Sequence, residues 1–236
     1  MSQPPARYQE PRQHTGHPRA LISRAAPLDT MAVPAHDRTV IVKPNRDRRT
    51  ERHEAIRQEI LDAAWDAAHE TSIAGLTLRD IATRVGMQQP SLYSHFASKQ
   101  AIYDAMFQQA WQAYLDSARN ALDGMPAEPR ARLIAMAEHY FDFAVADLPR
   151  HQLMDVNVVP NFQPSPEAYA PARQVYDLML GQLRGMGITR DEDADIYTAL
   201  LGGLVNQQLA NDPGGQRWRR LIPRVICMFA DDLGLP

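Results

Sequence analysis

Residues 77–99, TLRDIATRVGMQQPSLYSHFASK, constrain the fold more than any other part of the chain. Thr77 is a candidate helix N-cap, and Asp80 three residues later is the acidic partner of a capping box. An apolar face at helical spacing follows, formed by Leu78, Ile81, Ala82 and Val85. Gly86 stands where a residue with positive φ would end this helix. The pattern therefore predicts a short helix that stops at a tight turn.

A second short helix is predicted a few residues later. Pro90 lies in its first turn, where the missing N–H of proline costs nothing. Its apolar face is predicted from Leu92, Tyr93 and Phe96. Two short helices joined by about four residues, with a glycine in the turn, have the helix-turn-helix geometry. This geometry places the second helix in the major groove of DNA.

The segment resembles the DNA-binding region of the tetracycline-repressor (TetR) family. The residues that match in order and spacing are Thr77, Ile81, Ala82, Val85, Gly86, Leu92, Tyr93, Phe96 and Lys99. The clear match runs from about residue 56 to residue 106, and beyond it only the helical layout is similar. One departure is Gln88, because the family often has Ser or Thr at this N-cap. Gln caps poorly, so Gln88 is free to face DNA instead.

Phosphate contacts are expected around this motif. The resemblance implies that Thr77, Tyr93 and Lys99 position the DNA backbone, and His95 is a further candidate donor. For Tyr93 the alternative is a core aromatic that ties the two helices together. A basic cluster before the first helix supplies the other candidates, Arg46, Arg48 and Arg49.

Base contacts are expected from the start of the second helix, where side chains reach base edges. The candidates are Gln88, Gln89 and Ser91. A glutamine can form a bidentate pair with adenine, and a serine is permissive. One such unit reads too few base pairs for a genome, so we expect a homodimer on a pseudo-palindromic operator in double-stranded DNA.

Charge and cysteine content bound the function classes. The net charge is −3 over 236 residues, and it divides into +3 for residues 1–44, zero for 45–100 and −6 for 101–236. A DNA-binding unit without net charge needs basic residues that are clustered on one part of its surface to attract DNA phosphates. Cys227 is the single cysteine, which fits a reducing compartment. With no secretory signal and no membrane-length apolar run, we expect a cytoplasmic protein without a membrane partner.

No phosphate-binding loop, dinucleotide-binding turn, paired-cysteine motif or nucleophile elbow is present, so we do not expect an enzyme. No cofactor is expected. His139 and His151 lack companions at metal-ligand spacing, so no metal site is predicted either.

The chain is predicted to be all-α, in three parts. Residues 1–44 hold seven of the 18 prolines and are predicted to be a disordered extension. Three interpretations of this extension stay open: an arm that contacts DNA, a dispensable extension, or a start codon placed too early, with Met31 as the true start. Residues 45–100 form the helix-turn-helix domain, and residues 101–236 form a helical ligand-binding and dimerisation domain.

Helical patterns continue through the last part. Outside the helix-turn-helix, helices are predicted at about 48–70, 99–122, 127–148, 150–157, 165–184, 189–211 and 216–233. Ser98 is expected to cap the second of these, and Ser165 and Thr189 to cap the fifth and sixth, Thr189 with Glu192 as its capping-box partner. Pro223 should kink the last helix or mark its real start.

A small-molecule pocket in the last part is implied by the resemblance. The candidate lining residues are Trp111, Tyr114, Tyr140, Phe143, Met154, Phe162, Tyr176 and Met179. Such a set has the apolar character of a ligand site, with a few polar groups. For each residue the alternative is ordinary core packing.

The last two helices are the expected dimer interface, since family members dimerise there. The candidate residues are Leu200, Gly203, Leu204, Ile222, Val225, Ile226 and Phe229. The alternative is a bundle core inside one subunit. Together the patterns and the resemblance predict a dimeric transcriptional repressor, released from its operator by a small apolar ligand. The alternative function is a ligand-independent DNA-bridging or architectural protein.

Overall fold

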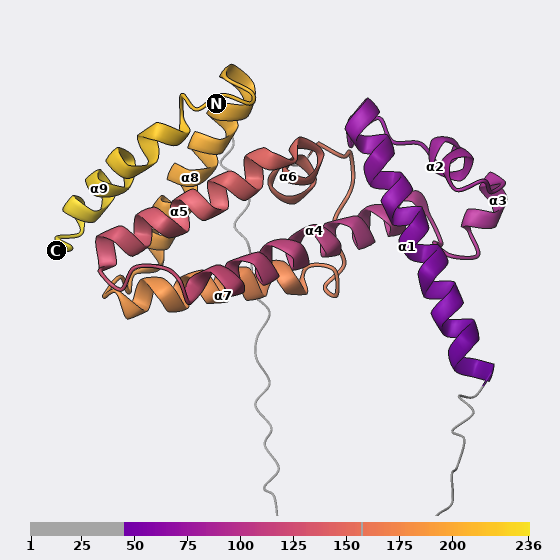
Figure 1. Cartoon of the computed structure of the whole chain (residues 1–236), viewed down its shortest axis with the longest axis horizontal. Coiled ribbons are helices and arrows are strands. Elements are labelled where there is room, and N and C mark those ends of the chain that lie inside the picture. Colours follow the sequence, from indigo (N-terminus) through magenta and orange to yellow (C-terminus); the bar gives the residue numbers. More distant parts are fainter. Residues whose placement is uncertain (1–44, 157) are drawn as a thin grey trace, which may run out of the picture. The chain divides into compact units, whose positions relative to one another are not determined.

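The computed structural model describes residues 45–156 and 158–236, with side chains from Arg48 onward, and this part of the chain contains helices and no strand (Figure 1). The predicted all-α class is therefore confirmed. The predicted extension at residues 1–44 and the side chain of Arg46 lie outside the described residues. No helix in the described part is both long enough and apolar enough to cross a membrane.

Four helices supply most of the first hydrophobic core. They are α1 (Asn45–Thr71), α2 (Leu78–Arg84), α3 (Gln89–Leu92) and α4 (Lys99–Leu122). Ile60 of α1 and Ile81 of α2 are fully buried there, and so is Met106 of α4. The core of the first three helices thus continues into α4. The predicted domain boundary at residue 100 stays a prediction, and α4 is the element shared across it.

Five further helices and a short 3-10 turn complete the chain. They are α5 (Pro129–Ala146), α6 (Leu148–Asp155), α7 (Ala170–Gly185), α8 (Asp191–Asn211), η1 (Arg219–Leu221) and α9 (Ile222–Asp232). α4 lies along α7, while α5 packs against α8 and α9 (Figure 1). A second core lies among α5, α8 and α9, with Leu133, Phe141 and Ile226 almost completely buried.

Two predicted helix starts are wrong, the first at Ser165. Helix α7 begins only at Ala170, and residues 166–169 form turns. The carboxylate of Asp104 on α4 accepts the backbone N–H and the hydroxyl of Ser165, both at 2.7 Å. Ser165 still accepts the N–H of Ala168 at 3.1 Å. This tertiary contact fixes Ser165 in a turn that precedes the helix.

The capping box predicted at Thr189 and Glu192 is also not formed. The N-cap of α8 is Arg190, with no side-chain cap bond. Its guanidinium instead donates to both carboxylate oxygens of Asp193, at 3.0 and 2.6 Å. This hydrogen bonding lowers the pKa of Asp193. Other predictions are confirmed: Ser98 caps α4 by accepting the Ala101 N–H, and Pro223 lies in the first turn of α9 and marks its start.

Candidate nucleic-acid interface and internal cavity

Thr77 caps α2 as predicted. Its hydroxyl oxygen accepts the N–H of Asp80 at 3.1 Å and donates its proton to a carboxylate oxygen of Asp80 at 2.6 Å. The capping box therefore forms through a direct bond between the Thr77 and Asp80 side chains. These bonds fix the Thr77 side chain at the exposed start of α2, and a helix start is where backbone N–H groups can meet an anion.

The turn between the two helices depends on Gly86, which has φ +67°. The N–H of Met87 donates to the carbonyl of Ala82 at 2.9 Å across this turn. Gln88 then occupies the N-cap of α3 without a side-chain cap bond. The prediction that Gln88 does not use its amide for capping is confirmed.

The candidate base-reading residues lie together at the start of α3. Gln88, Gln89 and Ser91 are all exposed, while Leu92 behind them is 1% exposed. The exposed and buried faces of this short helix are thereby separated. Polar side chains with hydrogen-bonding capacity toward base edges stand on the exposed face.

Tyr93 does not belong to the buried face, contrary to the predicted apolar set. Its side chain is 51% exposed, and Leu92 and Phe96 alone turn inward. Helical spacing could not predict which of these side chains is buried, because α3 ends before Tyr93 and the chain continues in turns. The exposed side chain fits the phosphate role better than the core role.

His95 lies differently from the other candidates. Its ring packs 4.7 Å from the ring of His53 on α1, and its carbonyl accepts a hydrogen bond from Arg57. Burial, and then the charges of His53 and Arg57, lower the pKa of His95 below its ordinary value. The half-buried, uncharged ring supports the turn after α3, which makes His95 a weaker phosphate candidate than the sequence indicated.

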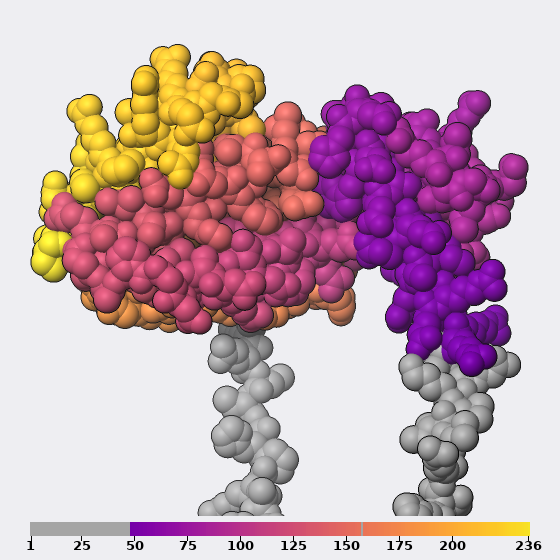
Figure 2. Space-filling model, viewed as in Figure 1, coloured from indigo at the N-terminus to yellow at the C-terminus, as the bar shows by residue number. Residues whose placement is uncertain are grey.

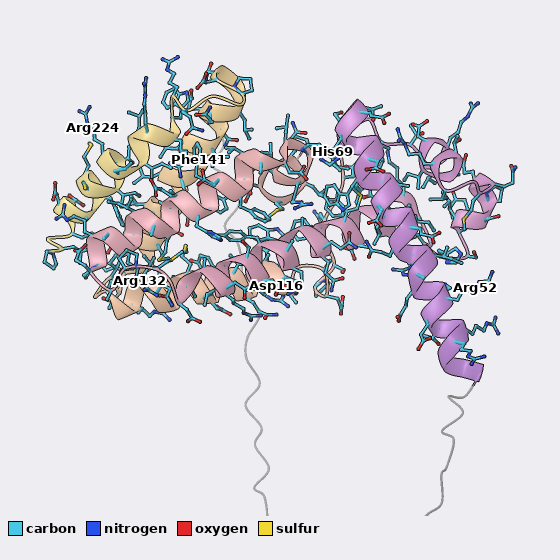
Figure 3. All side chains as sticks on the ribbon, in the orientation of Figure 1. Arg52, His69, Asp116, Arg132, Phe141 and Arg224 are labelled. Atoms are coloured by element: carbon cyan, nitrogen blue, oxygen red, sulfur yellow. The ribbon has the colours of Figure 1, made fainter. Side chains whose placement is uncertain are left out.

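The basic side chains differ in how freely they can contact a DNA phosphate. Arg84 binds Glu70 of α1, and this contact raises the pKa of Arg84 and lowers that of Glu70. Lys99 begins α4, with its Nζ 5.2 Å from the ring centroid of Tyr103. Arg48 and Arg49 are exposed near the start of α1, close to the Arg52 labelled in Figure 3.

Three exposed arginines therefore lie close together on α1, and Lys99 begins α4, in a domain whose formal net charge is zero. The hydroxyl of Tyr103 donates to the carbonyl of Ile73 at 2.8 Å. Burial raises the pKa of Tyr103 to about 12, so this hydroxyl stays a donor. The bond joins α4 to the turn that precedes α2.

Residues 60–106 match the family model described as bacterial regulatory proteins, tetR family. This helix-turn-helix domain belongs to the TetR family. The matched range contains α2, α3 and the start of α4, together with every candidate base-reading residue. The resemblance predicted from residues 56–106 is confirmed.

Known relatives support this TetR-family assignment over different lengths. The tetracycline repressor protein class D of Escherichia coli is 44% identical over 50 residues, 21% of this chain and 23% of the repressor. The HTH-type transcriptional activator FasR of Mycolicibacterium smegmatis is 33% identical over 101 residues, 43% of this chain and 46% of the activator. The chain thus matches less than half of the length of either relative.

A solved TetR-family structure extends the likeness in fold. The tetR-family transcriptional regulator from Streptomyces coelicolor superposes with a TM-score of 0.58 at 21% identity, covering 75% of this chain and 80% of its own. The helices that follow the TetR-family domain therefore share a known arrangement.

A cavity of about 680 Å³ lies within these following helices. Six of the eight predicted ligand-binding residues line it: Trp111, Tyr114, Tyr140, Met154, Tyr176 and Met179. They come from α4, α5, α6 and α7. The volume falls within the ordinary range for sites that bind small molecules.

Phe143 and Phe162, the other two predicted ligand-binding residues, do not line this cavity. The Phe143 ring packs against Tyr114, with centroids 5.0 Å apart. Phe162 packs against Tyr103 and Phe107, at 5.8 and 6.1 Å. Both rings fill the space behind the cavity wall, which is the core-packing alternative.

Two polar residues of the cavity lining, Asp155 and His139, were not among the predicted ligand-binding residues. The hydroxyl of Tyr140 donates to Oδ2 of Asp155 at 2.9 Å, and burial followed by the charge of Asp155 raises the pKa of Tyr140. His139 also lines the cavity, with Nε2 3.2 Å from the Ser117 hydroxyl, and burial lowers its pKa. No spacing signal in the sequence connects Asp155 with Tyr140, which precedes it by 15 residues on a different helix.

The predicted dimer-interface residues divide into two groups. Four of them, Leu204, Ile222, Ile226 and Phe229, are buried in the second core of the same chain. These four therefore follow the bundle-core alternative, since buried side chains have almost no surface to offer a partner. Leu200 and Val225 are half-buried, and Gly203 is exposed.

Other apolar side chains are exposed on the same two helices. Ile196 of α8 is 46% exposed and Met228 of α9 is 62% exposed. In Figure 2, α9 forms part of the visible surface, in yellow. The sequence pattern missed these residues because an apolar run does not show which of its faces the chain itself covers.

Proposed function

We propose that the chain is a sequence-specific DNA-binding transcriptional regulator, a dimeric repressor that a small apolar ligand releases from its operator. The observation that carries this proposal is the exposed set Gln88, Gln89 and Ser91 at the start of α3, in a TetR-family domain. Related proteins named as repressor and as activator share this domain. Repression follows the resemblance to the tetracycline repressors.

On DNA, α3 enters the major groove and its first residues meet base edges. Tyr93 and Lys99 position the phosphates, and Arg48 and Arg49 of α1 add phosphate contacts beside them. Thr77 contributes through the exposed end of α2. Arg46 belongs to the same basic cluster in sequence, and His95 has the lesser role of supporting the turn after α3.

Two copies of the chain bind one pseudo-palindromic operator, because one helix-turn-helix reads too few base pairs. A twofold interface uses the same patch on both copies. Gly203, Ile196 and Met228 are exposed on α8 and α9 and supply the central contacts, with Leu200 and Val225 beside them. This surface replaces the buried part of the set that the sequence suggested.

The cavity favours a ligand-responsive regulator over a ligand-independent architectural protein. Its walls are largely aromatic and sulfur-containing, and they contain a few polar groups that can orient a ligand. The protein acts in the cytoplasm on double-stranded DNA and performs no catalysis. A homodimer and a small-molecule effector are its other partners.

Mobility-shift titration with purified protein and a selected operator tests the DNA-binding site. We expect Gln89→Ala to change the preferred sequence, with a loss of about 1–3 kcal/mol of discrimination at one base pair. Lys99→Ala should weaken binding to all sequences alike and reduce the salt dependence by about one counterion.

Arg184→Ala is the matched control for Lys99→Ala, because it removes a positive charge from an exposed residue in the last turn of α7. It should leave DNA affinity unchanged. If Gln89→Ala and Lys99→Ala both bind operator as the original protein does, α3 is not the reading helix.

A further inference from the structure

We infer that the cavity selects a ligand with an apolar body and a cationic ammonium group, and that the carboxylate of Asp155 pairs with this charge. This inference rests on the proposed function in one respect, since it identifies the ligand as the regulator's effector. Asp155 ends α6, lines the cavity, and has a side chain that is 27% exposed. It is therefore within reach of a bound molecule.

The charges around the cavity favour a cation. Arg173 and Asp177 also line it, but both are exposed residues one turn apart on α7. Arg173 donates to the carbonyl of Pro166 at 3.1 Å. The lowered pKa of His139 leaves that ring uncharged at neutral pH. The lining therefore holds two carboxylates and one guanidinium, so it favours a cationic ligand over an anionic one.

The tyrosines of the cavity do not change the net charge of its lining. Burial raises the pKa of Tyr114, Tyr140 and Tyr197 above the ordinary value, so all three are neutral. Tyr140 uses its hydroxyl to donate to Oδ2 of Asp155. His151 approaches the same Oδ2, at 3.2 Å from its Nδ1. Among contacts within the described residues, Oδ1 is the oxygen left to a ligand.

Aromatic rings surround the same region. Tyr114 meets Tyr140 edge to face with centroids 5.4 Å apart, and Trp111 meets Tyr114 in the same way at 6.4 Å. Aromatic faces attract cations, and a carboxylate beside them adds direct charge pairing. Methionines from four segments complete the walls and suit an alkyl or aromatic body.

His151 is the competing partner for Asp155. It is 2% exposed, and its Nε2 lies 3.3 Å from Oδ1 of Asn206 on α8. His151→Gln keeps a hydrogen-bonding side chain and removes any ring charge. In that variant we expect the preference for a cationic ligand to persist or to increase.

Isothermal titration of the full-length protein with three ligands of equal chain length provides the test. The ligands are decyltrimethylammonium, decanol and decanoate. We expect decyltrimethylammonium to bind at least about tenfold more tightly than decanoate, an order of magnitude expected for one partly buried charge pair. Asp155→Asn should remove most of this difference and leave decanol affinity within about twofold.

Asp116→Asn is the matched control, because it makes the same chemical change at an exposed residue of α4 that does not line the cavity (Figure 3). It should leave all three affinities unchanged. The inference is overturned if decanoate binds as tightly as decyltrimethylammonium, if Asp155→Asn keeps the preference, or if none of the three ligands binds.

DNA titration of the ligand-free protein is measured separately. Loss of operator binding there overturns the proposed regulator and leaves the ligand preference standing. If the protein binds its operator but shows no preference for the cationic ligand, the ligand inference is overturned and the proposed regulator stands. The two failures are therefore distinguishable.

Discussion

Thr77 shows how much one residue can fix in a short helix. Helix α2 has only seven residues, too few to be stable alone, so its cap and its packing must hold it. The cap was predictable because the partners are three residues apart in sequence. The outward position of Tyr93 was not predictable, because it depends on where the chain leaves the helix. The half-burial of His95 depends on α1, 38 or more residues earlier.

Replacement of the Thr77 cap should destabilise the helix-turn-helix. We expect Thr77→Ala to lower the free energy of unfolding by about 1 kcal/mol, and Thr77→Ser to preserve most of it. Urea denaturation followed by circular dichroism measures the difference. Equal stability of the two variants would show that the exposed cap contributes nothing.

His139 should make stability depend on pH. Its folded-state pKa lies below the ordinary value of 6.5, because burial disfavours the charged ring. The unfolded chain therefore takes up a proton at higher pH than the folded chain. The stability contributed by the neutral ring is present above pH 6.5 and is lost as pH falls from there through the folded-state pKa.

We expect His139→Gln to reduce the fall in melting temperature between pH 7.5 and about 5.5. Comparison of thermal melts of the two proteins across this range isolates the contribution of the ring. A parallel decline in both proteins would mean that other groups cause the pH dependence.

At the scale of elements, local signals predicted helices better than they predicted helix ends. Ser98 and Pro223 mark real starts because their effect is confined to one turn. Ser165 failed because Asp104, 61 residues earlier, binds it. Thr189 failed because the bidentate pair of Arg190 and Asp193 forms at the start of α8 instead.

The burial of α9 also escaped the sequence pattern. Its apolar residues fit either a subunit core or a dimer interface, and only the packing of α5 and α8 decides between them. Ile226 is fully buried within the chain, whereas Met228 is 62% exposed. The two residues should consequently respond differently to substitution.

Met228→Lys combined with Gly203→Arg should convert the proposed dimer to a folded monomer, because both changes place charge on exposed surface. Ile226→Ala should instead destabilise each subunit by about 2–5 kcal/mol through lost packing. Sedimentation analysis and chemical denaturation distinguish the effects. A double variant that stays dimeric would place the interface elsewhere.

At the scale of the molecule, α6 connects the cavity with the first helices. Asp155 and Met154 near its C-terminal end line the cavity, while its N-cap Asp147 lies beside α1. Nε2 of His69, labelled in Figure 3, is 3.1 Å from Oδ1 of Asp147. A ligand that shifts α6 therefore acts on a contact with the helix that supports the DNA-reading motif.

Loss of the contact between His69 and Asp147 should weaken the coupling between ligand binding and DNA binding more than it weakens either binding step. We expect His69→Ala to keep DNA affinity and ligand affinity each within about threefold, and to reduce the ligand-induced loss of DNA affinity several-fold. The ratio of DNA dissociation constants with and without ligand measures the coupling. An unchanged ratio would exclude His69 from the coupling.

The proposed function requires α3 to read a DNA sequence. Its most direct test is to select random double-stranded DNA with the purified full-length protein and to sequence the retained fragments. We expect an enriched inverted repeat, and we expect Gln89→Ala to alter the same position in both half-sites. Retention of DNA without any enriched sequence, or no retention of DNA, would contradict it.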